Sequence, residues 1–314
     1  MKIKYALSII IFILIATILL TENKVNRKYD FVVEKNGSLD SYFCLKNICE
    51  SEYFSLIFNS KKIKCAFYDL SDKNITMLLK EKNADIIIDE DNYANYGEKI
   101  VGEGLMHNKF CVLDDKITIT GSFNPTENNK NDNNMIVIHS KTIAKNYESE
   151  FEIIKNNETP KRKAQSIILG NITVKNYFCP EDNCEKKILN ELNLANQSIE
   201  FLAFTFTDKS IAQTIINKHE KNLSVKGVIE SFQSHKLWTY PLFEQANISV
   251  KIDTKPTLQH NKVFIIDNNT VITGSFNPTW SANHINKENI LIIHDEKTAH
   301  SFDAYFAKLY NNII

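Results

Sequence analysis

The feature that most constrains this chain is a long motif that occurs twice. HNKFCVLDDKITITGSFNPT begins at His107, and HNKVFIIDNNTVITGSFNPT begins at His260, which lies 153 residues later (260 − 107). A sequence repeat of this length indicates an internal duplication, and each copy of a duplicated module folds into the same local structure. We therefore predict two copies of one structural unit.

Two further pairs of segments support the duplication. YFCLKNICE at Tyr42–Glu50 matches YFCPEDNCE at Tyr177–Glu185, and NNMIVIH from Asn133 matches ENILIIH from Glu288. Chance resemblance explains one such pair, but it does not explain three that follow one another in the same order. The duplication therefore extends over most of the chain.

The repeats divide the sequence into four segments. The first copy covers residues 29–156, the second copy covers 166–314, and the polar stretch NETPKRKAQ at 157–165 is typical of a linker. Hydrophobic residues make up 43% of the chain, which is enough for an ordinary core, and the net charge of −1 argues against a broad basic surface. A local basic cleft remains compatible with this composition.

The remaining segment, residues 1–28, carries an apolar run from Tyr5 to Thr21 after Lys2 and Lys4. A run of about 17 residues is near the minimum that crosses a bilayer. We expect a single-pass membrane anchor with the catalytic region outside the cytoplasm. A cleaved signal segment, which would leave a secreted protein, is the alternative, and a buried core helix is the third reading.

The six cysteines bear on whether the protein is exported from the cytoplasm. Cys44 and Cys49 form one C-x4-C pair and Cys179 and Cys184 form another, one in each copy. In an exported protein this spacing favours two local disulfides, whereas four thiolates could also hold zinc. Cys65 and Cys111 lie in apolar stretches, and we expect these two to be buried thiols.

The histidine motifs have the pattern of β-hairpins. Aromatic and branched residues follow each histidine, turns follow at Asp114 and Asp267, and the returning strands end at Gly121 and Gly274, where the backbone can bend or approach another group closely. Helical patterns at 184–196 and 209–222 are each followed by a strand-like run. This alternation predicts an α/β fold.

Each hairpin also carries groups that suit an anionic ligand. His107 and Lys109 lie two residues apart and share a strand face, as do His260 and Lys262. Nearby hydroxyl and amide groups come from Ser122, Asn124, Ser275 and Asn277. Imidazole, ammonium and amide groups together favour a phosphate. Two such faces could bring two histidines to one phosphorus, one to attack and the other to protonate the leaving oxygen.

These duplicated H-x-K-x4-D and G-S-x-N patterns resemble the two HKD motifs of the phospholipase D superfamily. The resemblance implies two modules packed as one pseudo-twofold globule with a single active site, so that a monomer suffices. It implies a phosphohistidine intermediate on one histidine, with the other as general acid, and no metal or cofactor. It assigns phosphate binding to Lys109, Lys262, Asn124 and Asn277 with support from Ser122 and Ser275, and structural roles to Asp114 and Asp267. At the turns, we expect these aspartates to hydrogen-bond their own backbone.

The third pair of repeated segments, NNMIVIH and ENILIIH, differs in its first residue. Glu288 stands where the superfamily often has a carboxylate that contacts a catalytic histidine, whereas the first copy has Asn133 there. A neighbouring carboxylate favours an imidazolium. We therefore expect Glu288 to lie beside His260 and to keep it protonated as the acid, which leaves His107 neutral as the nucleophile.

The sequence leaves the function open among three classes of protein: a lipid phosphodiesterase, an endonuclease and a non-catalytic binding protein. Phospholipid hydrolysis suits the anchor and the charge balance, and Trp238 and Tyr240 could touch an interface, although ordinary loop packing explains them as well. A membrane-tethered or secreted endonuclease is the alternative. Its basic groove could draw on Lys61, Lys62, Lys64, Lys161, Arg162 and Lys163. Intact His, Lys and Asn in both copies argue against a third class, a binding protein without catalysis.

Overall fold

The computed structural model describes residues 31–127, 129–158, 166–232 and 239–313. The chain separates into Met1–Phe31 and a compact unit, Val32–Ile314, which contains all three pairs of repeated segments. The predicted anchor at 1–28 lies outside the described residues, as do Trp238 and most of the predicted linker. In the part of the chain that is described, no helix has the length and apolarity needed to cross a bilayer.

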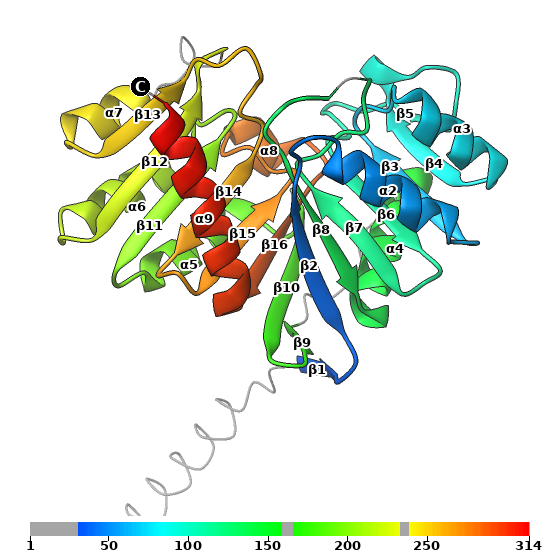
Figure 1. The fold of residues 1–314 in the computed structure, drawn as a ribbon, viewed down its shortest axis with the longest axis horizontal. Coiled ribbons are helices and arrows are strands. Elements are labelled where there is room, and N and C mark those ends of the chain that lie inside the picture. Colours follow the sequence, from blue (N-terminus) through cyan, green and yellow to red (C-terminus); the bar gives the residue numbers. More distant parts are fainter. Residues whose placement is uncertain (1–30, 128, 159–165, 233–238, 314) are drawn as a thin grey trace, which may run out of the picture. The chain divides into compact units, whose positions relative to one another are not determined.

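The first copy forms a seven-stranded mixed sheet with the order β2-β8-β7-β6-β3-β4-β5 (Figure 1). Its strands are β2 (Ser38–Phe43), β3 (Ile63–Phe67), β4 (Asp85–Asp89), β5 (Glu98–Ile100), β6 (Lys109–Leu113), β7 (Ile117–Gly121) and β8 (Asn134–His139). Its helices are α2 (Ile48–Phe58), α3 (Lys73–Glu81), the short η1 (Glu90–Asn92) and α4 (Lys141–Asn156). Strands β3, β4 and β5 run parallel, and the remaining pairs are antiparallel.

The second copy repeats this order in a nine-stranded sheet, β1-β9-β10-β16-β15-β14-β11-β12-β13. Two short strands extend it, β1 (Phe31–Glu34) and β9 (Ser166–Leu169). The others are β10 (Ile172–Cys179), β11 (Ser198–Ala203), β12 (Ser224–Glu230), β13 (Ser249–Asp253), β14 (Lys262–Ile266), β15 (Thr270–Gly274) and β16 (Glu288–His294). The helices are α5 (Cys184–Leu194), α6 (Lys209–His219), α7 (Tyr240–Gln245), α8 (Trp280–His284) and α9 (Glu296–Asn312). The predicted duplicated α/β fold is confirmed.

The two sheets share one buried core. Phe110 and Tyr147 of the first copy belong to the same apolar cluster as Phe178 and Phe302 of the second. The ring of Tyr147 meets the rings of Phe110 and Phe178 edge to face, at centroid distances of 5.0 and 4.9 Å. Each copy has a second apolar cluster of its own, which includes residues of α2 and α3 in one case and of α5 and α6 in the other. The copies therefore pack as one body.

The predicted helices begin where their capping residues stand. Helix α5 begins after Asn183, whose side chain accepts a hydrogen bond from the Lys186 amide, and α6 begins after Asp208, whose carboxylate accepts one from Ile211. Such caps satisfy amides that the first turn leaves without an intrahelical partner. Both helices end two or three residues before the predicted ends at 196 and 222.

The motif aspartates fix the hairpins in a way that the sequence did not show. Asp114 has a φ of 50° and Asp267 has a φ of 52°, as tight two-residue turns require. The Asp114 carboxylate accepts bonds from the amides of Lys61 and Lys62, both at 2.9 Å. Asp267 likewise accepts bonds from the segment that leads into β11. The expectation that they bond their own backbone was therefore wrong, because the turn lies against the start of the neighbouring strand.

All six cysteines form disulfides. Cys44 pairs with Cys49 and Cys179 with Cys184, so these sulfurs are bonded to one another and not arranged around a metal. Cys65 pairs with Cys111, which corrects the expectation that both are thiols. The two residues are far apart in sequence, but antiparallel strands β3 and β6 place them directly opposite each other.

The two motif glycines lie where adjacent strands come too close for a side chain. Gly121 has a φ of 139°, and a Cβ atom there would stand 2.5 Å from the carbonyl oxygen of Asn134. Gly274 has a φ of 154°, and its Cβ would stand 2.2 Å from the carbonyl oxygen of Asn289. The close approach that the sequence indicated is therefore to the next strand of the same sheet.

Candidate active site

The segment before each histidine crosses to the other copy of the module. Met106 forms an isolated parallel bridge with Lys287, and Gln259 forms one with Asp132. As a result, the start of β6 lies beside the start of β16, and the start of β14 lies beside the start of β8. The two histidine motifs therefore meet at one place between the sheets.

His107 is held by a carboxylate of the other copy. Its Nδ1 lies 2.9 Å from Oε2 of Glu288, whose side chain is fully buried. The hydroxyl of Ser275 donates to the same carboxylate oxygen at 2.5 Å. With Nδ1 as the donor to this carboxylate, the ring keeps the lone pair of Nε2 free.

His260 is held by neutral groups instead. Its Nδ1 donates to Oδ1 of Asn133 at 2.9 Å and to the carbonyl oxygen of Ser122 at 3.2 Å. The expectation that Glu288 lies beside His260 was therefore wrong. Glu288 of the second copy contacts His107 of the first, and Asn133 of the first copy contacts His260 of the second. A pseudo-twofold arrangement exchanges the partners in this way.

The two lysines stand in matching places. Lys109 donates to the carbonyl oxygen of His107 at 2.7 Å, and Lys262 donates to that of His260 at 2.6 Å. Both residues are only 3–4% exposed, so their charges are poorly hydrated. An anionic phosphate that enters between them would restore the lost solvation.

Burial dominates the electrostatics of the site. It lowers the pKa of Lys109 to about 7, and together with Lys109 it lowers the pKa of Lys262 well below its usual value. Burial and the two ammonium groups also lower the pKa values of His107 and His260, which keeps both rings neutral. Burial raises the pKa of Glu288 to about 8, against the opposing effect of Lys109 and Ser275. Perturbed groups that face one another in this way are typical of active sites.

The serines and asparagines of the G-S-x-N motifs divide into two kinds. The Ser122 hydroxyl donates to Asn133 Oδ1 at 3.0 Å and Ser275 donates to Glu288, so both serines position the groups that hold the histidines. The Oδ1 atoms of Asn124 and Asn277 are buried and accept no hydrogen bond from any described residue. An amide oxygen accepts hydrogen bonds and does not bind a phosphate oxygen, so the phosphate-binding role of these two residues, which would use their amide nitrogens, stays a prediction.

A polar network between the copies was missed in the sequence. Asn289 donates to Asn108 at 2.7 Å, and Asn134 donates to Asn261 at 2.9 Å. Thr120 and Thr273 donate in turn to the same two asparagines of β16 and β8, Asn289 and Asn134. The available signal was the asparagine that follows the histidine in both motifs. Its presence in both copies marked it as part of the repeated unit, whereas its burial and its partner in the other copy are visible only in the structure.

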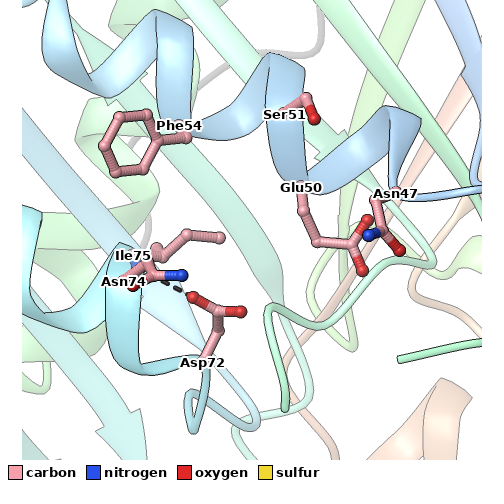
Figure 2. Close-up of a pocket in the computed structure, with 7 residues that line it drawn as sticks. All are labelled: Asn47, Glu50, Ser51, Phe54, Asp72, Asn74 and Ile75. Atoms are coloured by element: carbon pink, nitrogen blue, oxygen red, sulfur yellow. Dashed lines mark hydrogen bonds between the residues drawn. The ribbon is translucent and has the colours of Figure 1, made fainter. Parts of the chain in front are cut away.

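A hollow with a volume of 580 Å³ lies between α2 and the start of α3, and neither histidine lines it. Figure 2 shows its lining residues, among them Glu50, Phe54 and Asp72. Within the described ranges, no three His, Cys, Asp or Glu side chains gather as a metal site. The predicted basic positions Lys62 and Lys64 are paired with Glu148 at 3.0 and 2.8 Å. Lys161, Arg162 and Lys163 lie outside the described residues.

Comparison with known proteins places the chain in a family. The family described as "Cardiolipin synthase, PLD-like domain" matches residues 53–155 and 188–310. The two matches coincide with the two copies and cover more than half of the chain. The protein therefore belongs to the phospholipase D superfamily.

The curated relatives match less than half of the chain. A phospholipase D of Rickettsia prowazekii is 38% identical over 135 residues, which is 43% of this chain and 66% of that protein. A mitochondrial cardiolipin hydrolase of Chlamydomonas reinhardtii is 30% identical over 142 residues, covering 42% of this chain and 64% of that one. The chain thus spans about two thirds of the length of these relatives, and their names support a phosphodiesterase hydrolase.

A solved structure extends the fold match to both copies. The phosphatidylserine synthase of Haemophilus influenzae superimposes with a TM-score of 0.66 over 88% of this chain and 89% of that protein. Its sequence identity is 12%, so this likeness concerns the fold alone.

Proposed function

We propose that the protein is a phosphodiesterase that acts through a phosphohistidine on His107, with His260 as the general acid. The observation that carries the proposal is the unequal support of the two rings, a buried carboxylate at Nδ1 of His107 and an amide at Nδ1 of His260. Burial raises the pKa of Glu288 to about 8, but the positive charge that the ring gains when its Nε2 bonds to phosphorus favours the ionised carboxylate, which in turn stabilises that charge. An amide fixes the orientation of the ring without adding a charge.

The reaction proceeds in two displacements at phosphorus. Nε2 of His107 attacks, the bond to the leaving oxygen breaks, and that oxygen takes the proton from Nε2 of His260. In the second step His260 removes a proton from water, the water oxygen bonds to phosphorus, and the bond to His107 breaks. The bound phosphate offsets the charges of Lys109 and Lys262, and this favours the protonated form of His260 that the first step requires.

For the substrate we propose a phospholipid. Supporting observations are the lipid-acting names of the curated relatives and the near-neutral charge of the chain. The apolar run at 5–21 and the three disulfides support a membrane-anchored protein whose catalytic region is outside the cytoplasm, with a secreted protein as the alternative.

The test uses the full chain, purified in detergent and reconstituted with mixed phospholipid vesicles in the presence of a chelator. We expect wild type to release phosphatidic acid, and His107→Asn and His260→Asn to lose at least about 1,000-fold in rate, since each removes a reacting group. A p-nitrophenyl phosphodiester has a leaving group that departs without a general acid. With this substrate, His260→Asn should still accumulate an acid-labile phosphoryl group on the peptide that contains His107.

Two outcomes would contradict the proposal. A phosphoryl label that His107→Asn accumulates on the peptide that contains His260 would reverse the two roles. Cleavage of single-stranded DNA by wild type with no release from vesicles would replace the lipid substrate by a nucleic acid and establish the endonuclease alternative.

A further inference from the structure

An ion cluster joins the two copies beside His260. The ammonium group of Lys255, in the segment between β13 and His260, lies 2.5 Å from the carboxylate of Asp132 in the other copy and 3.0 Å from that of Asp253. The two aspartate side chains are 8% and 0% exposed. Burial alone would lower the pKa of Lys255, but the hydrogen bonds and charges of the two carboxylates outweigh it and raise that pKa. The lysine therefore keeps its charge and holds the two carboxylates together.

Asp132 is the residue directly before the one that holds the His260 ring. Its carbonyl oxygen accepts a hydrogen bond from the amide of His260 at 2.9 Å, and its own amide donates to the carbonyl oxygen of Leu258 at 2.8 Å. The next residue, Asn133, accepts the bond from Nδ1 of His260. A displacement of Asp132 would therefore move Asn133 relative to the imidazole ring.

Among the described residues, the matching place beside the other histidine has no such cluster. Lys287 is the counterpart of Asp132, because each forms the isolated bridge to the residue before a histidine, and it pairs with a glutamate of its own copy at 2.6 Å. Ile100 is the counterpart of Asp253, because each forms the last pair of its strand with the neighbouring strand. Gly102 lies 153 residues before Lys255 and has no side chain to pair (255 − 153 = 102). The module therefore folds without this cluster.

The support of the two histidines differs in its sensitivity to position. Glu288 contacts His107 through a buried carboxylate, whereas Asn133 offers a neutral oxygen, whose hydrogen bond weakens steeply as its geometry worsens. The amide nitrogen of Asn133 makes two long hydrogen bonds, at 3.2 Å to Asn131 and at 3.4 Å to Asn129. Asn133 thus depends on the backbone around it for its placement, and the ion cluster holds that backbone at the preceding residue.

We propose that Lys255 is a positioning residue for the general acid. Through Asp132 it keeps Asn133 against Nδ1 of His260, and the ring then directs its Nε2 proton to the leaving oxygen. Lys255 should therefore matter most for substrates whose leaving group needs that proton, and a purely structural role would slow all substrates alike. This inference rests on the proposed role of His260 as the general acid.

The test measures the first displacement by the full chain with bis(p-nitrophenyl) phosphate and with diphenyl phosphate. Each diester has two identical ester groups, so the bond that breaks always leads to a phenol, which is a good leaving group in the first case and a poor one in the second. Rapid-quench measurement of the first turnover gives the rate of this step. We expect Lys255→Met to lower the rate about 10-fold with diphenyl phosphate and less than about 2-fold with bis(p-nitrophenyl) phosphate.

Three further variants serve as controls. Asp132→Asn leaves Lys255 paired with Asp253, should show the same dependence on the leaving group, and decides the question if Lys255→Met does not fold. Lys255→Arg keeps the charge and should restore both rates to within about 3-fold of wild type. Lys175→Met is the matched control, because Lys175 forms an ion pair of similar exposure with Glu191, at 3.1 Å, and it should keep the ratio of wild type.

The outcomes separate the inference from the function on which it rests. A larger loss with diphenyl phosphate in Lys255→Met or Asp132→Asn, which Lys255→Arg does not share, supports the positioning role. If His260→Asn slows diphenyl phosphate more than the nitrophenyl ester while these two variants slow both esters equally, the positioning role is refuted and the phosphodiesterase stands. If His260→Asn slows both esters equally, His260 is not the acid, and the proposed mechanism fails together with the inference.

Discussion

The substitution Glu288→Gln tests the unequal support of the two histidines most directly. Glutamine has the shape of glutamate, and its side-chain oxygen can still accept the hydrogen bonds of His107 and Ser275. What changes is the charge, because the position then resembles Asn133 beside His260. The variant therefore makes the two histidines electrostatically alike while the fold stays the same.

The expected loss follows from the burial of Glu288 and its contact with His107. A hydrogen bond to a charged group contributes ~1.5–3 kcal/mol, and a bond between neutral groups contributes about 1 kcal/mol. The carboxylate also stabilises the positive ring of the intermediate, and full burial of the side chain leaves little screening by water. A total of about 3 kcal/mol corresponds to a decrease in kcat of roughly 100-fold. KM should change little, since Glu288 acts on the ring and not on the bound phosphate.

The assay measures kcat and KM with p-nitrophenyl phosphocholine, and it uses Asn133→Ala as the matched control. Asn133→Ala removes a neutral bond to His260 Nδ1, which corresponds to about 1 kcal/mol and a decrease of roughly 5- to 10-fold. The two variants alter equivalent positions, but Glu288→Gln removes only a charge whereas Asn133→Ala removes a whole neutral bond. A larger loss in Glu288→Gln therefore shows that the charge contributes more than such a bond does. Equal losses in the two variants, or a loss below about 3-fold in Glu288→Gln, would refute the reasoning.

Two further predictions concern stability. Lys109→Met should abolish activity and raise the free energy of unfolding by about 2–4 kcal/mol at pH 7. The folded pKa of Lys109 is about 7 against a usual 10.5, so the gain should shrink as the pH rises towards 10.5, and guanidinium unfolding at pH 7 and 9.5 would show whether it does. Replacing Cys65 and Cys111 by alanine should cost about 4 kcal/mol, whereas replacing Cys44 and Cys49 should cost about 2 kcal/mol, because the first pair closes a longer loop; thermal unfolding that ranks the pairs in the opposite order would contradict this.

Much of the fold could be predicted from the repeated motif. A sequence that occurs twice with aromatic and branched residues around a turn fixes two hairpins, and it places His107 with Lys109 and His260 with Lys262. The helices at α5 and α6 followed from local patterns for the same reason. These predictions succeeded because the features depend on residues close together in the chain.

The partners across the copies could not be predicted in this way. Glu288 was assigned to the histidine of its own copy, because the sequence shows order along the chain and not the exchange that a pseudo-twofold arrangement produces. The bond between Cys65 and Cys111 was missed for a related reason, since the register of β3 against β6 decides it.

The exchange of partners between the copies has a consequence for how such a chain diverges after duplication. A substitution in one half changes the chemistry of the histidine encoded in the other half, as Asn133 does for His260. Neither half can drift freely, because Asn108 and Asn261 each depend on a residue encoded in the opposite half. A division of labour between nucleophile and acid can nevertheless arise from a change at a single codon, 133 or 288, which leaves both histidines untouched.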